Sequence, residues 1–303
     1  MTRALVLGRR RPGRDISGAI AETSAELEAA GWTIESRLVR RKKALRRRAA
    51  GAAKAGVDVV VAVGGDGAVL QVVQSIAETP VALGIVPMGT GNLLATNLGI
   101  PERRAAAVEV LLRGIQRRID VGRATVDGRT RCFSVACGVG FDAHVMRATS
   151  RRRKVRLGRL AYLVSALGQR RQVRDAGYEL TLDGRSGRLE AMQLLVANCG
   201  RLGGAFKPKL PIRPDDGVLD VIAIRGRGPL DALLAGWEAL RQRRRGRSRG
   251  RRAFRGTARS VSIRSTNPRL VEIDGTVVGS TPVEIEVRPG ALIVLVPGDA
   301  EVE

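Results

Sequence analysis

Short apolar runs alternate with helical patterns over the first 115 residues of the chain. ALVL is followed by an amphipathic stretch from about Ile16 to Ala30, which Gly31 closes, and then by WTIESRLV and a basic helix through Lys54. Next come the apolar run VDVVVAV, a helical pattern over residues 68–77, and a second apolar run, VALGIVP. A continuous apolar run such as VDVVVAV is typical of a parallel strand that is buried on both faces. This order of elements predicts a doubly wound α/β sheet.

From Arg117 onward the pattern changes to alternating apolar and polar residues. Strands joined by short Gly and Asp turns predict an antiparallel β-sandwich or barrel. We therefore expect an α/β domain over residues 1–120 and a β-rich domain over residues 121–303, and leave open that the last residues pack back on the first domain. The segments that carry this pattern are RIDVGRATVDG, RCFSVACGVG, VLDVIAIRG, SVSIRS and VEIEVRPGALIVLVP.

Composition supports a folded chain with anionic partners. Hydrophobic residues make up 44% of the 303 residues, which indicates a globular protein, but aromatic residues are only 3%, so few side chains are available to stack on bases. The 53 basic residues against 29 acidic ones give a net charge of +24. A field of this size favours nucleic acid, phosphorylated ligands or an anionic membrane surface.

Cysteine and histidine usage indicates a reducing compartment and argues against a histidine metal site. The three cysteines form no CxxC pair, and His144 is the only histidine. The simplest interpretation is a cytoplasmic protein. The sequence has no apolar run of the ~18 residues that a membrane-spanning helix needs, so we expect membrane contact to be peripheral, at the inner face.

Two arginine-rich segments interrupt the β-rich half, at residues 151–156 and in RQRRRGRSRGRR from Arg241 to Arg252. The glycines and like charges of the second segment predict a mobile basic loop, either simply solvated or bound to an anionic membrane. Nucleic acid would attract the same charges. We disfavour it because the sequence lacks a helix-turn-helix, zinc or RNA-recognition pattern. The sequence does not determine the oligomeric state, and a homodimer is one of the alternatives.

A glycine turn follows the apolar run VDVVVAV. Backbone N–H groups in a glycine-rich turn between a strand and a helix can bind an anion, and the positive end of the helix dipole adds to this attraction. Asp66 cannot bind phosphate directly, so its expected role is to hold Mg²⁺ against the phosphates. The alternative is that Asp66 only caps the next helix. The turn consists of Gly64, Gly65, Asp66 and Gly67.

A second turn, MGTGN, repeats this layout after the strand VALGIVP. Two such turns at neighbouring strand ends would face one crevice, which favours a nucleotide site. Thr90 is a candidate phosphate contact, and Asn92 could orient a ligand hydroxyl or a metal-bound water, or could simply be a helix cap. The turn contains Gly89, Thr90, Gly91 and Asn92.

Taken together, several motifs resemble the diacylglycerol kinase catalytic-domain family, which includes bacterial lipid kinases and sphingosine kinases. They are VGGDGAVLQVV, VPMGTGNLLATNLGIP, RRIDVGRA, GVGFDA, PDDGVLDV and EIDGTVVGSTPVEIEVRPGALIVLVP, which fall in the family's order over residues 57–297. The resemblance implies an ATP-dependent kinase of a lipid such as diacylglycerol, with an α/β nucleotide-binding domain followed by an all-β lipid-binding domain.

The resemblance also implies roles for individual residues. The first turn, from Gly65 to Gly67, would contact the ATP phosphates and their Mg²⁺, and Thr90 would be a further nucleotide contact. Asp120 would lie at the domain junction near the reacting groups. A structural Mg²⁺ would be held by three residues near the DDG turn, through a carboxylate and two backbone carbonyls, which are the oxygen ligands that Mg²⁺ prefers. These three are Asp216, Arg213 and Val218.

The chain departs from the family at positions that matter for catalysis. The usual GGDGT reads GGDGA, with Ala68, and the family's DGE motif, which carries its proposed general base, reads Asp274-Gly275-Thr276. Threonine cannot accept a proton at neutral pH. Help from a general base is typically worth about 10²–10⁴-fold, so the loss predicts weak rather than absent transfer. A catalytically silent nucleotide- or lipid-binding protein and a kinase of a soluble substrate such as NAD remain the alternatives.

Overall fold

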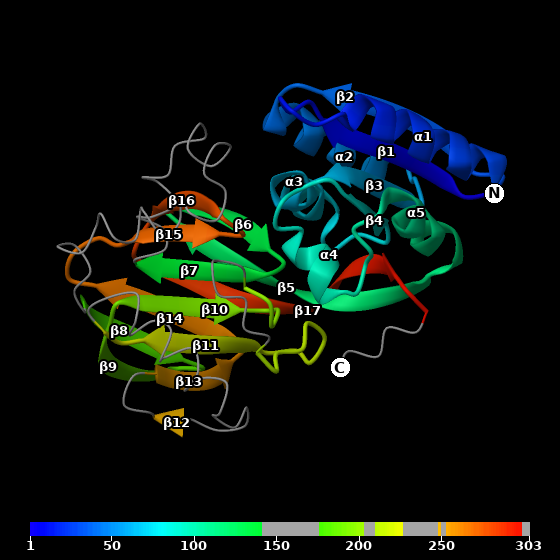
Figure 1. Cartoon of the computed structure of the whole chain (residues 1–303). Coiled ribbons are helices and arrows are strands. Elements are labelled where there is room, and N and C mark those ends of the chain that lie inside the picture. Colours follow the sequence, from blue (N-terminus) through cyan, green and yellow to red (C-terminus); the bar gives the residue numbers. More distant parts are fainter. Residues whose placement is uncertain (141–175, 203–209, 227–247, 250–252, 299–303) are drawn as a thin grey trace. The chain divides into compact units, whose positions relative to one another are not determined.

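The computed structural model describes residues 1–140, 176–202, 210–226, 248–249 and 253–298 (Figure 1). The chain forms two compact units. Unit 1 contains Met1–Val121 together with the chain from Pro289 onward, and unit 2 contains Gly122–Arg288. The predicted basic loop over residues 241–252 lies outside the described residues except for two of its members, and the basic segment at 151–156 and His144 lie outside them entirely.

Unit 1 is built on a parallel sheet in the strand order β2-β1-β3-β4, which confirms the predicted α/β architecture. Every residue of β3 and β4 is buried, as the continuous apolar runs of these strands predict. The last part of β17 extends the sheet, because Ile293 and Val294 pair in parallel with β4. The strands are β1 (Arg3–Arg9), β2 (Thr33–Val39), β3 (Val59–Gly64), β4 (Ala82–Pro87) and β17 (Val283–Val296).

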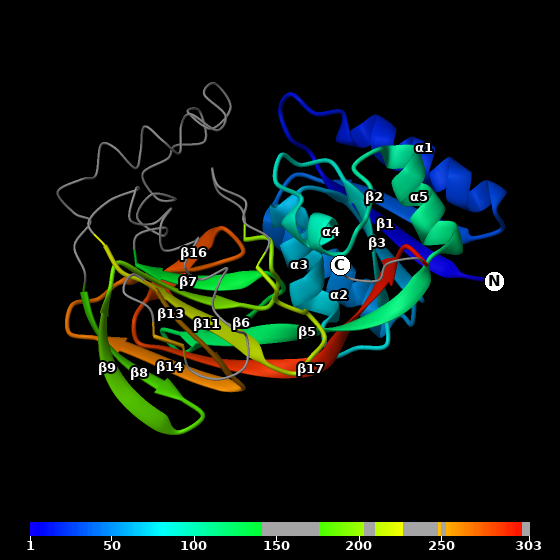
Figure 2. The same ribbon diagram turned by 60° about the horizontal axis from the view of Figure 1, so that its bottom comes forward.

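Helices cover both faces of this sheet (Figure 2). On one face, α1 and α5 pack against each other and against alternate strand residues such as Val59, Val61 and Val63. On the other face, α2 packs against α3. The amphipathic stretch at 16–30 and the basic segment ending at Lys54 form helices as predicted. The helices are α1 (Ile16–Ala29), α2 (Lys42–Lys54), α3 (Asp66–Ile76), α4 (Leu93–Asn97) and α5 (Arg104–Arg113).

Unit 2 consists of antiparallel strands around an apolar core, as the alternating pattern predicts. One sheet has the order β12-β13-β11-β10-β7-β15-β16, and β14 pairs with both β8 and β17 in the other. In β8, buried residues alternate strictly with more exposed ones, so one face of the strand is buried in the core.

The strands of unit 2 are separated by short turns in several places. They are β6 (Arg129–Phe133), β7 (Ala136–Gly140), β8 (Ala176–Leu182), β9 (Arg185–Ala191), β10 (Gln193–Ala197), β11 (Leu219–Ile224), β12 (Ser248–Arg249), β13 (Ala253–Ala258), β14 (Ser260–Ser265), β15 (Leu270–Ile273) and β16 (Thr276–Ser280). β5 (Ile115–Val126) and β17 run through both units. None of the described helices is long and apolar enough to cross a membrane.

Candidate functional site

The first glycine turn joins β3 directly to α3. β3 ends at Gly64, Gly65 is the N-cap, and Asp66 is the first residue of the helix, so α3 begins two residues earlier than the pattern near residue 68 predicts. Asp66 and Gly67 therefore lie in the first turn of α3, where backbone N–H groups have no acceptor within the helix. Such groups, together with the helix dipole, are suited to bind an anion.

Asp66 links this turn to the second one. Its Oδ2 accepts the N–H of Asn92 at 3.1 Å and its Oδ1 accepts the N–H of Leu93 at 2.5 Å. The carboxylate thus caps α4, 26 residues further along the chain, and not its own helix. Each carboxylate oxygen has more than one lone pair, so these two hydrogen bonds leave acceptor capacity for a metal ion or a metal-bound water.

Asn92 shapes the second turn. It occupies the N-cap position of α4 in a left-handed conformation, with φ of 47°, but its side chain does not cap the helix. Its Oδ1 instead accepts the N–H of Gly89 at 2.8 Å, and its Nδ2 donates to the carbonyl of Gly89 at 3.3 Å. Asn92 is buried, whereas Thr90 at the tip of the same turn is exposed to solvent. Of the polar residues in this turn, Thr90 is therefore the one open to a ligand.

The two turns touch through their glycines. A Cβ on Gly65 would lie 2.8 Å from the Cα of Gly89, and a Cβ on Gly91 would lie 2.6 Å from the Asp66 carboxylate. Carbon side chains do not fit at such distances, so contact between the turns requires glycine at these positions independently of any ligand. The structure thus brings together the eight residues predicted for the nucleotide site: Gly64, Gly65, Asp66, Gly67, Gly89, Thr90, Gly91 and Asn92.

Two cations beside the first turn were not among the predicted site residues. The Lys42 Nζ lies 3.8 Å from the position that a Cβ on Gly67 would take, and an Arg11 guanidinium nitrogen lies 3.7 Å from the corresponding position on Gly65. Lys42 begins α2, directly after β2, and Arg11 lies in the loop after β1. The carboxyl ends of parallel strands lie at one edge of a sheet. Lys42 and Arg11 each follow a predicted strand, so their positions in the sequence could have indicated that they lie near the glycine turns.

Asp120 has a clear structural contact. It lies in β5, is 2% exposed, and its Oδ1 accepts the N–H of Gly290 at 2.8 Å. Gly290 has φ of 59°, a conformation that favours glycine, within β17. Asp120 therefore fixes β17 at this residue, and a role near the reacting groups stays a prediction.

The Asp274-Gly275-Thr276 motif forms the tight turn between β15 and β16. Asp274 and Gly275 both have positive φ, and Ile273 pairs with Thr276 across the turn. The turn separates the two arms of the hairpin, and Glu272 instead pairs with Val277. The Thr276 side chain therefore does not continue the face formed by Glu272 and Asp274.

The Asp274 carboxylate is enclosed by hydrogen-bond donors. It accepts the N–H groups of Ser134, Val135 and Ala136 at 2.9–3.0 Å, and the Ser134 hydroxyl at 3.0 Å. Burial raises the pKa of Asp274 above its ordinary value, and these four donors partly oppose that rise. A carboxylate held in this way fixes the hairpin against the loop before β7, and it is poorly placed to accept a proton from a substrate.

The DDG turn presents oxygen ligands at the surface. Asp216 is exposed, and its Oδ1 accepts the N–H of Val218 at 3.4 Å, while the Arg213 side chain pairs with Asp215 at 3.3 Å. No group of three His, Cys, Asp or Glu side chains able to hold a metal ion occurs among the described residues. A metal ion here would thus depend on backbone carbonyls beside a single carboxylate, and this all-oxygen donor set fits Mg²⁺.

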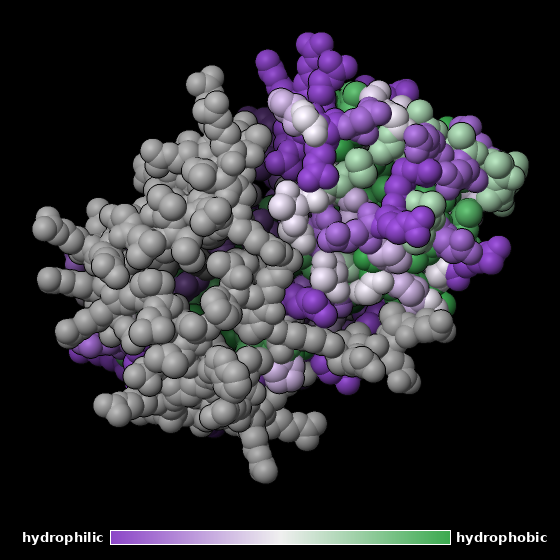
Figure 3. Space-filling model, viewed as in Figure 1, coloured by the Kyte–Doolittle hydropathy of each residue, from purple (hydrophilic) through white to green (hydrophobic). Residues whose placement is uncertain are grey.

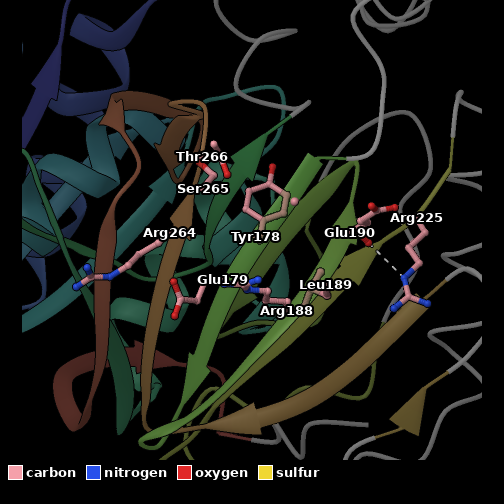
Figure 4. Close-up of a pocket in the computed structure, with 10 residues that line it drawn as sticks. Tyr178, Glu179, Arg188, Leu189, Glu190, Arg225, Arg264, Ser265 and Thr266 are labelled. Atoms are coloured by element: carbon pink, nitrogen blue, oxygen red, sulfur yellow. Dashed lines mark hydrogen bonds between the residues drawn. The ribbon is translucent and has the colours of Figure 1, made fainter.

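Unit 2 has a polar pocket of about 920 Å³ (Figure 4). It is formed by β8, β9, the end of β14 and Arg225, whose Nε donates to the Glu190 carbonyl at 3.3 Å. Tyr178 lies beside Ser265 and Thr266 in this view, and Glu190 lies with Arg225. Charged and hydroxyl-bearing side chains dominate the lining, which suits a polar group of a ligand better than an acyl chain.

Unit 1 is a parallel α/β unit with paired glycine turns and unit 2 is a β-sandwich unit, so the chain belongs to the class of two-domain α/β plus β-sandwich proteins. Residues 4–124 match the diacylglycerol kinase catalytic domain, and residues 135–296 match the YegS C-terminal NAD kinase beta sandwich-like domain. The chain belongs to the diacylglycerol kinase catalytic-domain family.

Individual proteins are similar to the chain over most of its length. The chain is 30% identical over 278 residues to a probable lipid kinase YegS-like of Pseudomonas fluorescens, covering 90% of this chain and 88% of that protein. It is 26% identical over 285 residues to an uncharacterized protein of Synechocystis, covering 93% of this chain but only 64% of that protein. The fold is similar to the crystal structure of a putative diacylglycerol kinase from Bacillus anthracis, with a TM-score of 0.78, 22% identity and 97% of each chain covered.

Proposed function

We propose that this protein is an ATP-dependent lipid kinase that transfers the γ-phosphate of ATP to the hydroxyl of a lipid such as diacylglycerol, giving phosphatidic acid. The observation that carries the proposal is the contact between two glycine turns at the ends of neighbouring parallel strands, one of which begins α3. Membership of the diacylglycerol kinase catalytic-domain family supports it. In the reaction the lipid oxygen forms a bond to the γ-phosphorus, the bond to the β–γ bridging oxygen breaks, and ADP leaves.

On the nucleotide side, the N–H groups of Asp66 and Gly67 would bind phosphate oxygens, helped by the positive end of α3. The ammonium of Lys42 and the guanidinium of Arg11 lie beside these groups. They would stabilise the negative charge on the transferred phosphate in the transition state. Mg²⁺ that arrives with ATP would neutralise phosphate charge. Asp66 is held in place by Asn92 and Leu93, so it would orient that ion or its waters without having to reorganise.

On the acceptor side, unit 2 would supply two elements of the proposed enzyme. The polar pocket beside Tyr178 offers hydroxyl and charged groups to a lipid headgroup. The DDG turn would hold a second, structural Mg²⁺ through the Asp216 carboxylate and the carbonyls of Arg213 and Val218, and would thereby fix the segment that leads into β11.

Proton removal is the weak part of this site. Thr276 replaces the family's proposed general base, and the hydrogen bonds of Asp274 occupy the nearest carboxylate of the same turn. Transfer through a loose transition state depends mainly on positioning and charge stabilisation. We therefore expect the hydroxyl proton to go to solvent, and the rate to be lower than that of a family member with the DGE motif by about 10²–10⁴-fold.

The test is phosphate transfer from labelled ATP by the full chain. Diacylglycerol in mixed micelles, a sphingoid base in mixed micelles and NAD without detergent are supplied in parallel. Label in phosphatidic acid is the expected result, and Gly65→Ala, which separates the turns, should abolish it. Label in NAD alone would move the assignment to a kinase of a soluble substrate.

The replacement at Thr276 favours a second candidate, a catalytically silent protein that binds ATP and lipid. Its signature would be ATP binding by calorimetry without label in any acceptor, even after long incubation. In that case the kinase proposal fails while the nucleotide site stands.

A further inference from the structure

Nine exposed cations lie on unit 1 in two segments, one directly after β1 and one that follows β2 and continues into α2. They lie in the loop after β1 and in the segment RRKKALRRR after β2. The N–H of Arg10 donates to the Val39 carbonyl at 2.9 Å, which joins the two segments. Figure 3 shows strongly hydrophilic residues over this end of the unit. We call this surface the basic edge: Arg10, Arg11, Arg14, Arg40, Arg41, Lys43, Arg46, Arg47 and Arg48.

The basic edge is not neutralised by neighbouring acidic groups. None of the nine side chains forms an ion pair with a carboxylate among the residues that the structure describes. Asp15, the acidic residue of the first loop, accepts the N–H of Gly18 at 2.8 Å and so caps the N-terminus of α1. Glu35, on β2, pairs with Arg37 at 3.0 Å. The positive field at this edge therefore extends into solvent and favours an anionic partner.

A single nucleotide does not account for this surface. Within the edge, Arg11 lies beside the first glycine turn, where a phosphate would bind under the proposed function. Lys43 and Arg47 are one helical turn apart on α2, whose buried residues, Leu45 and Ala49, face the unit's interior. These outer cations therefore point away from the protein, where they are open to an extended anionic surface.

We propose that the basic edge docks the protein on an anionic lipid bilayer. The choice of a bilayer rests on the proposed function, since a lipid acceptor has to be reached at a membrane. Each Lys or Arg near an anionic surface contributes about a fivefold increase in binding. Single-stranded nucleic acid is the less suitable partner because the edge carries no aromatic side chain to stack on bases, and duplex DNA is a competitor that the test below includes.

The test is sedimentation of the full chain with vesicles in the absence of ATP, so that its outcome does not depend on turnover. Vesicles of phosphatidylcholine alone are compared with vesicles of phosphatidylcholine mixed with phosphatidylglycerol. We expect binding to the mixed vesicles alone, and weaker binding as salt rises, because salt screens exposed charges. Binding to both kinds of vesicle with equal affinity would overturn the proposal.

A pair of charge-matched variants locates the surface. The double variant Lys43→Gln, Arg47→Gln should bind mixed vesicles about 25-fold more weakly than the wild-type protein, because two cations are removed. The control is Arg103→Gln, Arg113→Gln, which removes two exposed charges, one at the N-cap and one at the last residue of α5, on the other face of the sheet, and should keep wild-type binding. An equal loss in both variants would show that overall charge, and not the basic edge, is responsible.

Two further measurements separate this proposal from its competitors. If the double variant loses affinity for duplex DNA but binds mixed vesicles like the wild-type protein, the edge serves nucleic acid and the proposal is wrong. Kinase activity of the double variant in neutral micelles should equal that of the wild-type protein, whereas on mixed vesicles it should fall. Vesicle binding at the basic edge without phosphate transfer to any lipid would support docking while refuting the kinase function.

Discussion

Gly89→Ala should break the contact between the two glycine turns. A Cβ on residue 89 would lie 2.6 Å from the Gly65 Cα and 2.6 Å from the Asn92 Oδ1. Carbon atoms pack at about 3.5–4.0 Å, so the turns would have to separate by roughly 1 Å. They follow β3 and β4, whose residues are all buried, so neither turn can move without disturbing the sheet. Overpacking of this kind costs about 1–3 kcal/mol. A loss of about 2 kcal/mol lowers Tm by roughly 4–8 °C.

Gly67→Ala is the matched control from the same turn. Its Cβ would meet the Lys42 Nζ at 3.8 Å and Cε at 3.9 Å, which are ordinary contacts. Alanine also favours the helix by about 1 kcal/mol relative to glycine. Tm should therefore stay the same or rise, while ATP affinity falls because the methyl group fills space beside the proposed phosphate contacts.

Both variants can be assayed by thermal unfolding followed by circular dichroism and by calorimetric titration with ATP. The reasoning would be refuted if Gly89→Ala unfolded at the wild-type temperature, because the glycines would then not be required by contact between the turns. A wild-type ATP affinity in Gly67→Ala would place the phosphates elsewhere while leaving the packing argument intact.

Two substitutions and one chemical modification test unit 2. Thr276→Glu should raise transfer to lipid by about 10²-fold or more by supplying a general base, and no gain in the label-transfer assay would mean that catalysis is limited elsewhere. Asp274→Ala should leave the N–H groups of residues 134–136 without their acceptor and lower the free energy of unfolding by about 3 kcal/mol; an unchanged denaturant midpoint would contradict this role. Burial and the nearby Glu272 and Asp274 carboxylates raise the pKa of Cys137, so iodoacetamide at pH 8 should modify the partly exposed Cys132 first, which mass spectrometry of the native protein can check.

The main elements of unit 1 could be predicted because local sequence determines them. The apolar run of β3 is buried throughout, and Gly31, which ends the pattern of the first helix, has φ of 84°, a conformation that most residues avoid. The start of α3 was placed too late, because Gly-Asp-Gly is typical of a loop when read locally. In the structure the contacts of the second turn hold Asp66 in the first turn of the helix.

Long-range contacts explain what the sequence could not reveal about the site. Asp66 and Asn92 are 26 residues apart, and no local pattern indicates that the carboxylate of one caps the helix that follows the other. Likewise, Lys42 appears in the sequence as one of many cations, and only the packing of α2 against α3 brings it beside Gly67. The eight turn residues could be predicted as a group because they follow neighbouring parallel strands.

The position of β17 at the end of the sequence affects how the protein folds during translation. Its residues Ile293 and Val294 pair with β4 in unit 1, although the whole of unit 2 lies between the two strands in the sequence. A ribosome therefore releases all of unit 2 before unit 1 has its final strand. Until then, the edge of β4 is unpaired and its apolar residues lack a neighbour, which is a condition that favours aggregation. The nascent chain should thus depend on rapid folding of unit 2, or on a chaperone, to protect an α/β sheet that the first 121 residues cannot complete.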